Sequence, residues 1–334
     1  MHRRLAAQTA FRLFGLFLGF SLLASPLLLR ASSGKRVHLA PRFVPGATLR
    51  YNIESRAATT GTTTTPIVNP EGGTRSSVTI HLLVRLDVLS PPTSGAARLR
   101  ATFEKSSAES QSDAFDPAQP PISDQYAGLQ GQYLEFTIAP GGHFTDIKGL
   151  DDAPAIRAAR QSSLSWLAGV SFAAGFPADG IEIGQKWKSE RPVEGAPLAG
   201  LAWHVEYTYL RDEPCSPPPG VGAAPRPSAS PDSCAVILSR FEISRAGSPH
   251  SDATPEDYLR NGLRVSGSWT GSGENLSYVS LASGLLVRST ETSDQQMDYK
   301  ITSAASGSNV HRQAQVHAQS EIMFDSATSV SPTK

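Results

Sequence analysis

The side chains of this sequence that could do chemistry are two cysteines, eight histidines and a few neighbouring carboxylates. Cys215 and Cys234 enclose residues 216–233, an insert rich in Pro, Gly, Ser and Ala. A disulfide between them would close a loop of about 20 residues and contribute roughly 3 kcal/mol, less if strand pairing already holds the ends. The pair therefore predicts a disulfide and an oxidising compartment. Two free buried thiols or a metal pair are the alternatives.

The histidines do not form a metal-binding pattern. His81, His204 and His317 fall on the polar phase of expected strands, and the others lie in the leader, turns or loops. His311 and His317 would lie about 20 Å apart on a strand, too far to share a metal. No nucleophile elbow, zinc-protease, Walker, dinucleotide-binding or C-x-x-C motif occurs. The sequence thus predicts no catalytic residue, no metal ligand and no cofactor.

Length and charge limit the class of protein. The 334 residues could form one large or two ordinary domains. Thirty basic and thirty acidic side chains cancel, so no global field would attract nucleic acid. The 28 Gly and 25 Pro residues, with only 18% charged side chains, suit an extracytoplasmic β-protein with long turns.

The N-terminus predicts export. Residues 1–33 have a basic start, an apolar run from Leu13 to Leu29 and small residues at the end, which is typical of a signal peptide. The apolar run is at the lower limit for a membrane span, so an uncleaved anchor is the alternative. The chain is therefore expected to be periplasmic or secreted, with membrane contact only through this segment if it stays attached.

Alternation of apolar and polar residues predicts a mainly β fold. About a dozen segments show it, near residues 49–54, 78–88, 98–104, 134–138, 144–147, 187–193, 201–209, 234–243, 263–269, 276–281, 285–292, 297–301 and 314–324. Helical spacing and end signals predict one substantial helix at about 152–174 and one short helix at about 255–261. Residues 105–127 are interpreted as a polar loop.

These segments predict a large antiparallel curved sheet or a partly closed barrel. Residues 34–45 are interpreted as a linker, 46–325 as a single β-rich domain and 326–334 as a disordered tail. Two lobes, split near residues 150–180, are the alternative, but no linker there resembles a domain boundary.

Large aromatic residues supply the candidate binding site. Trp187, Trp203, Tyr207 and Trp269 could line an apolar pocket. The alternative is that they simply fill a β core.

Four segments carry a resemblance to a loosely defined group of exported bacterial β-rich proteins of unknown function. They read GATLRY at 46–51, LQGQYLEFTIAPGGHF at 129–144, GFPADGIEIGQKW at 175–187 and VSLASGLLVR at 279–288. In broad shape the chain also resembles the lipoprotein-carrier class, in which a curved antiparallel sheet wraps an apolar cavity with helices at its mouth. The resemblance brings no catalytic residues, and the insert between the cysteines departs from it.

The expected function is that of a non-catalytic exported protein. It would bind an apolar small molecule or lipid in the concave face of its sheet, or act as an interaction module with an envelope protein. An exported hydrolase with a dispersed active site that matches no motif is the alternative.

Overall fold

Long antiparallel strands make up most of the protein in the computed structural model. It describes residues 36–64, 73–93, 96–113, 121–139, 144–150, 163, 166, 167, 169, 170, 176–193, 196–215, 232–245, 252–303, 305 and 307–329. The strands are β1 (Ala47–Thr64), β2 (Thr74–Thr93), β3 (Ala96–Ser112), β4 (Tyr133–Ile138), β5 (Phe144–Lys148), β6 (Lys186–Pro192), β7 (Leu201–Pro214), β8 (Ser233–Arg245), β9 (Leu263–Ser280), β10 (Leu286–Ser303) and β11 (Asn309–Ser329). Two short helices, α1 (Ile122–Ala127) and α3 (Glu256–Arg260), accompany them. The prediction of a mainly β fold is confirmed.

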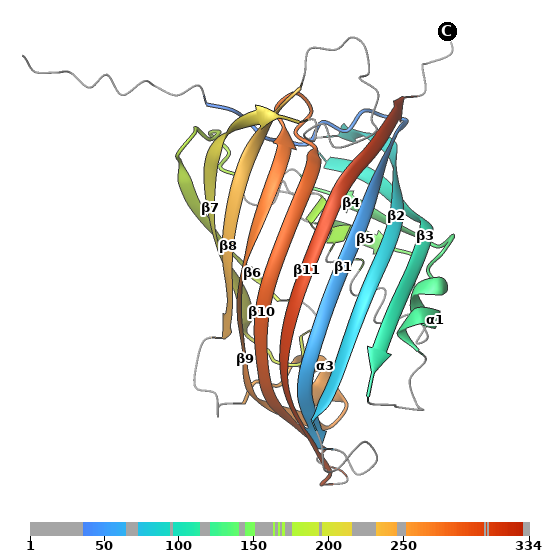
Figure 1. Cartoon of the computed structure of the whole chain (residues 1–334), viewed down its shortest axis with the longest axis vertical. Coiled ribbons are helices and arrows are strands. Elements are labelled where there is room, and N and C mark those ends of the chain that lie inside the picture. The colour runs from blue at the N-terminus through green and yellow to red at the C-terminus, as the bar shows by residue number, and fades with distance from the viewer. Residues whose placement is uncertain are drawn as a thin grey trace, which may run out of the picture. The chain divides into compact units, whose positions relative to one another are not determined.

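All eleven strands belong to one antiparallel sheet, in the order β5-β4-β3-β2-β1-β11-β10-β9-β8-β7-β6. The first and last strands of the chain are neighbours in its centre, and each half of the chain spreads outwards from them as a meander (Figure 1). The sheet is curved but not closed, because β5 and β6 remain its two edges. The open curved sheet is therefore the correct alternative of the two predicted.

This strand order forces the chain between β5 and β6 to pass from one edge of the sheet to the other. Four described residues of this connection, Leu150, Leu167, Val170 and Ile181, are buried in the main hydrophobic cluster together with residues of the central strands. The connection therefore covers one face of the sheet, which we call the inner face. Residues Lys35–Lys334 form one compact unit, even though the two meanders divide in sequence at this connection.

Strict alternation assigns side chains to the two faces. On β1, Leu49, Tyr51 and Ile53 are buried on the inner face, and Arg50 and Glu54 lie on the opposite, outer face. The main cluster occupies the inner face of β1–β4 and extends to β8–β11. A minor cluster packs at the other end of the β7–β10 region and comprises Leu198, Leu201, Ile243, Ala253, Val265 and Tyr299.

Several strands are longer than the sequence indicates. β3 continues to Ser112 through residues expected to form a loop, and β9 and β10 each join two expected segments into one strand of 18 residues. Small and polar residues occupy the inner phase there, so the apolar alternation fades although the strand continues. In β9, for example, a Cβ on Gly273 would overlap the Phe241 ring of β8, which explains the glycine.

The helices and ends also differ in part from expectation. The short predicted helix is confirmed as α3, whereas α1 lies in the expected loop. The helix predicted at 152–174 lies largely outside the described residues, although the five described between 163 and 170 are helical. β11 extends to Ser329, into the expected tail. Val37 forms an isolated β-bridge with Ile181, and Leu39 is buried, so the expected linker packs on the core.

The predicted leader, residues 1–33, lies outside the described residues. Among the residues that are described, no helix combines the length and apolarity needed to cross a membrane.

The predicted disulfide is present between Cys215 and Cys234, whose Cα atoms lie 4.9 Å apart. It joins the ends of β7 and β8, where Glu213 already pairs with Cys234 in the ladder. Most of the insert that it closes, residues 216–231, lies outside the described residues.

Because strand pairing holds this neck, we expect reduction of the disulfide to lower stability without unfolding the sheet. The double variant Cys215→Ser, Cys234→Ser should lose at most about 3 kcal/mol of unfolding free energy in urea, the chain-entropy value for a loop of this length. Its far-ultraviolet circular dichroism should remain that of the oxidised protein. Collapse of the β spectrum would show that the neck depends on the covalent bond.

The close approach of β1 to β11 gives a second prediction. A Cβ on Gly61 would overlap backbone atoms of Gln313 and Ala314, which belong to the paired strand and cannot turn away. Gly61→Ala should therefore reduce the unfolding free energy by about 1–3 kcal/mol. The control is Thr62→Ala, at the next, exposed position of the same strand, which should change it by less than about 0.5 kcal/mol. Equal effects of the two changes would contradict the tight pairing.

Candidate functional site

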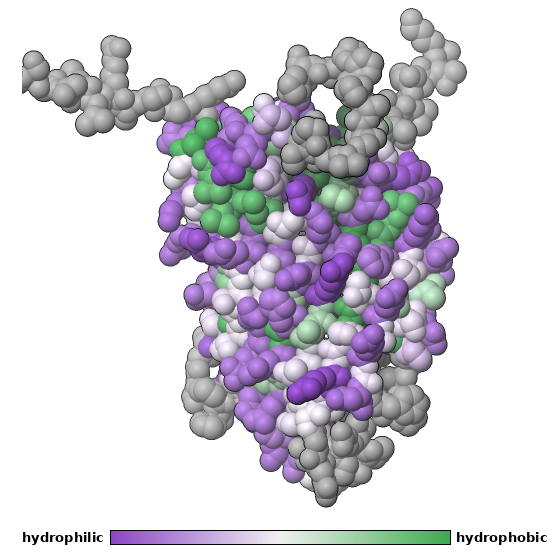
Figure 2. All heavy atoms as spheres, viewed as in Figure 1, coloured by the Kyte–Doolittle hydropathy of each residue, from purple (hydrophilic) through white to green (hydrophobic). Residues whose placement is uncertain are grey.

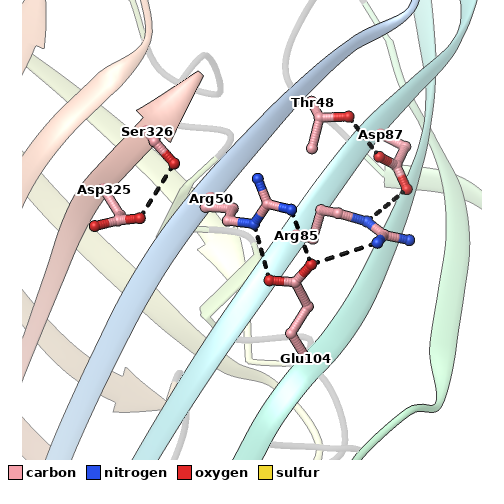
Figure 3. A network of polar contacts seen from close by, with 7 residues as sticks. All are labelled: Thr48, Arg50, Arg85, Asp87, Glu104, Asp325 and Ser326. Carbon is pink, nitrogen blue, oxygen red and sulfur yellow. Dashed lines mark hydrogen bonds and ion pairs between the residues drawn. The ribbon is translucent and has the colours of Figure 1, made fainter. Parts of the chain in front are cut away.

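The outer face is a ladder of paired charges, shown for its centre in Figure 3. The Arg50 guanidinium on β1 donates to both oxygens of Glu104 on β3, at 2.9 and 3.1 Å. Arg85 on β2 lies between Glu104, at 3.4 Å, and Asp87, at 3.1 Å. The pairing register shifts between Phe103 and Lys105, and this bulge leaves Glu104 opposite no single residue of β2. The Arg50 hydrogen bond holds the pKa of the Glu104 carboxyl below its ordinary value.

The histidines of the outer face lie beside carboxylates. The pairs are His81 with Glu54 at 3.7 Å, His204 with Glu190 at 3.4 Å, His311 with Asp298 at 2.7 Å and His317 with Asp294 at 2.9 Å. His81, His204 and His317 thus lie on the polar phase, as the sequence predicts. Within the described part of the chain, no three His, Cys, Asp or Glu side chains come together as a metal site would require.

An open hollow of about 1160 Å³ crosses β6–β10 on the outer face. Its lining includes five carboxylates and two cations, but the cations Lys188 and Arg240 are already paired with Glu206 and Glu274. Figure 2 shows this side as mostly hydrophilic, with a hydrophobic area over the upper parts of β7 and β8 as drawn. The hollow is therefore a hydrated, charged surface and not an apolar pocket.

The inner face is different, because polar side chains there lie among buried apolar ones. The feature that organises it is a row of directly opposed residues, which we call the central row. From β6 to β3 it reads Trp187, Tyr207, Ser239, Asn275, Glu291, Ser320, Ser55, Ile80 and Ala108. The row thus begins with two aromatic residues on β6 and β7 and continues with hydrogen-bonding side chains on β8–β10. The small residues Ser320 and Ser55 follow on β11 and β1, in the centre of the sheet.

At the β6 end of the row, Trp187 and Tyr207 stack with ring centroids 5.2 Å apart and planes 7° from parallel. Phe176, from the connection that covers this face, lies 5.9 Å from the Trp187 ring. The Tyr207 hydroxyl lies 3.5 Å from that of Ser189. The indole therefore packs against two aromatic rings at the margin of the main cluster.

The structure places the four predicted pocket residues in two groups. Trp187 and Tyr207 pack against the main cluster, whereas Trp203 and Trp269 pack against the minor cluster. The Trp203 ring meets Phe241 edge to face, and Trp269 Nε1 donates to the Gln295 side chain at 3.2 Å. The sequence predicted that these four aromatic residues line one pocket. It does not show that they pack on two different clusters.

In the middle of the row, three side chains form a closed hydrogen-bonded ring. Ser277 Oγ donates to Asn275 Oδ1 at 2.6 Å, Asn275 Nδ2 donates to Ser289 Oγ at 2.8 Å, and the two hydroxyls lie 3.3 Å apart. Each hydroxyl can thus donate once and accept once within the ring. Asn275 Nδ2 also lies 3.4 Å from the Glu291 carboxylate. Asn275-Leu276-Ser277 also matches the N-x-S glycosylation sequon, and the Asn275 side chain is held here by hydrogen bonds within the sheet.

Among the described residues, four polar atoms are buried on the inner face without a hydrogen-bond partner. They are Tyr51 OH, Ser106 Oγ, Trp187 Nε1 and Ser239 Oγ. Burial raises the pKa of the Tyr51 phenol far above its ordinary value. An unpaired buried polar group costs about 1–3 kcal/mol, so four on one face of a sheet require an explanation.

Sequence reasoning missed this polar part of the site. Ser239, Ser289 and Glu291 do not match any motif, and Asn275 and Ser277 match only the glycosylation sequon. One feature of the sequence could have revealed these polar residues. They alternate in phase with the apolar residues Ile237, Phe241 and Val279, so they fall on the buried face of β8–β10.

Comparisons with known proteins place the chain in no defined family. No family model matches it, and no curated protein sequence matches it. Among solved structures, lipovitellin, studied for its lipid–protein interactions, matches 87% of this chain with 11% identity and a TM-score of 0.46. The match spans only 26% of the lipovitellin chain.

Two channels also match. An outer-membrane channel from Pseudomonas putida F1 has 9% identity and a TM-score of 0.18, covering 85% of this chain and 97% of its own. The monoaromatic hydrocarbon channel CymD has 10% identity and a TM-score of 0.10, covering 85% and 89%. These likenesses decide nothing about the family or function of this chain. The resemblance to a loosely defined β-rich group stands at the level of the observed strand architecture.

The outer ladder gives a pH prediction. Because the folded-state pKa of Glu104 is lowered, its contribution to stability is present above about pH 4.5 and is lost as the pH falls through the folded-state value. Glu104→Gln should therefore cost roughly 1 kcal/mol at pH 7 and clearly less at pH 3, because the wild-type protein begins to lose this contribution as the pH falls below about 4.5.

Urea unfolding of both proteins at the two pH values measures this difference. The control is Glu109→Gln, an exposed position on the same strand, which should have little effect at either pH. A cost for Glu104→Gln that does not change with pH would show that the charge of Glu104 is not what stabilises the ladder.

Proposed function

We propose that this chain is a non-catalytic exported protein that holds an apolar ligand against the inner face of its sheet. The observation that carries the proposal is the set of four buried polar atoms without partners, all on that face. A bound molecule with a few polar atoms would pair them and remove their cost. A ligand between the sheet and its covering segment is the simplest occupant, because the described buried residues of that segment are apolar, as is the sheet face on which they pack.

The size of the side chains along the inner face supports this location. The main and minor clusters are separated by a zone of small residues, defined by Ala57, Gly273, Ser293 and Ala318 in one cross-strand row and by Ser55 and Ser320 beside it. Bulky residues fill the face on either side of this zone. We therefore propose that the apolar chain lies over Ala57, Ser293 and Ala318, whereas the Phe241 ring already covers Gly273.

The polar ring favours binding over catalysis. A nucleophilic serine needs a neighbouring base to take its proton. Ser277 and Ser289 are bonded instead to the Asn275 side chain and to each other, and an amide does not serve as that base. The ring therefore acts as a rigid support beneath the site.

An oxidising compartment is consistent with the disulfide between Cys215 and Cys234. We accordingly propose that the protein works outside the cytoplasm, where an apolar molecule needs a carrier or a shelter from water.

The test is to purify the protein from its exported form and identify bound compounds by native mass spectrometry and solvent extraction. We expect a co-purifying apolar compound and, after its removal, saturable binding of a fluorescent apolar probe. A preparation free of such compounds that also binds no probe would overturn the proposal.

A matched pair of variants locates the site. Ala318→Leu adds volume to the zone of small residues and should reduce probe binding about tenfold or more. Gln319→Leu adds a similar side chain at the next residue, which is exposed on the outer face, and should leave binding unchanged. Equal effects would place the ligand elsewhere.

A further inference from the structure

We propose that β6 is an interface with a second copy of this chain, in which the two sheets pair edge to edge about a two-fold axis at Ser189. This inference goes beyond the proposed function and does not depend on it. β6 is one of the two edges of the sheet, and among the described residues it pairs only with β7. An edge strand of this kind presents backbone N–H and C=O groups to which another strand can bond.

The backbone of β6 points towards this edge at every second residue. Just before the strand, Tyr209 N donates to Gln185 O, and just after it Val193 N donates to Leu201 O. The β6–β7 register runs between these two bonds without a shift. In an antiparallel pair, residues that bond to the partner strand alternate with residues that point away from it. The odd-numbered residues of β6 therefore bond to β7, and the even-numbered ones point to the edge.

The even-numbered residues of β6 include Lys186, Lys188 and Glu190. The side chains of Lys188 and Glu190 line the outer face and are 80% and 68% exposed. Glu206 of β7 lies 3.3 Å from Lys186 and 3.7 Å from Lys188, so one carboxylate faces two ammonium groups. One lysine is therefore in excess over Glu206, and a carboxylate from outside the chain would neutralise it.

A second copy of β6 supplies that carboxylate in one register. Ser189 is the middle residue of the seven in β6, so a two-fold axis through it pairs the whole strand. Residues at equal distances on either side of the axis then lie opposite each other, which places Lys188 opposite Glu190 of the second copy, twice over by symmetry. An axis through Lys188 or Glu190 would instead set like charges opposite each other and shorten the overlap.

Lysines on an edge strand usually oppose pairing. Glu190 removes this protection in the register centred on Ser189, because each Lys188 then meets an opposite charge. Ser189 also suits the axis. As an odd-numbered residue it would form a non-hydrogen-bonded pair with its own copy, in which the Cα atoms approach to about 4.5 Å, and its side chain is small enough for that distance. Backbone phase, charge and side-chain size thus favour the same register.

The experiment measures association of the exported, disulfide-bonded protein by sedimentation velocity over a range of concentrations. We expect a monomer–dimer equilibrium. Glu190→Lys and Lys188→Glu should each weaken the dimer about tenfold or more, because like charges then face each other twice across the axis. An equimolar mixture of these two variants should dimerise again, since every charge in the mixed pair meets its opposite.

The control is Glu242→Lys, which makes the same change of charge on the outer face of β8, away from the edge. It should leave the dimer unchanged. A monomer at every concentration, or a dimer that Glu190→Lys does not weaken, would overturn the inference. Larger assemblies that persist in both charge variants would also overturn it, by indicating that β6 pairs with β5 of another copy. Failure of the mixture to dimerise would show that the register is wrong.

Discussion

β1 pairs with β11 from Ala47 opposite Ser329 to Thr64 opposite His311, and the rest of the sheet depends on this pairing. Without it the eleven described strands would form two separate meanders with four edges, because no other pairing among them joins the halves. With it, the connection between β5 and β6 must cross the whole sheet. One contact between the two ends of the chain therefore creates both a single wide sheet and the cover of its inner face.

The two faces of that sheet satisfy their polar groups in different ways. On the outer face, arginines and carboxylates of neighbouring strands neutralise one another in a hydrated ladder, as the Arg50, Glu104 and Arg85 group shows. On the inner face, Asn275, Ser277 and Ser289 satisfy one another, but Ser239 and Trp187 in the central row do not find partners for Oγ and Nε1. This asymmetry is the physical basis for placing a ligand on the inner face, despite the larger hollow outside.

Much of the fold could be predicted from the sequence, and little of the candidate site. Alternation at Leu49–Ile53 or Leu82–Val88 is a local signal, and it gave the strands, their faces and the β class. The same signal failed at Ser106–Ser110 and at Gly271–Asn275, because small and polar residues occupy the inner phase of the strand there. Trp187 and Tyr207 were chosen as large aromatics, but the choice did not separate them from Trp203 and Trp269, which pack on the other cluster.

The sequence by itself determined the properties that depend on near neighbours: the period of two along each strand, the short helix α3 and a bridge between cysteines at the two ends of one hairpin. The tertiary structure decided what depends on residues far apart in the chain. The central row sets Ser55 opposite Ser320 and Ser239 opposite Asn275, and only this register shows which buried donors find a partner. Hydrogen bonding is a property of neighbours in space, so a polar residue on an apolar phase acquires a meaning only when the sheet is assembled.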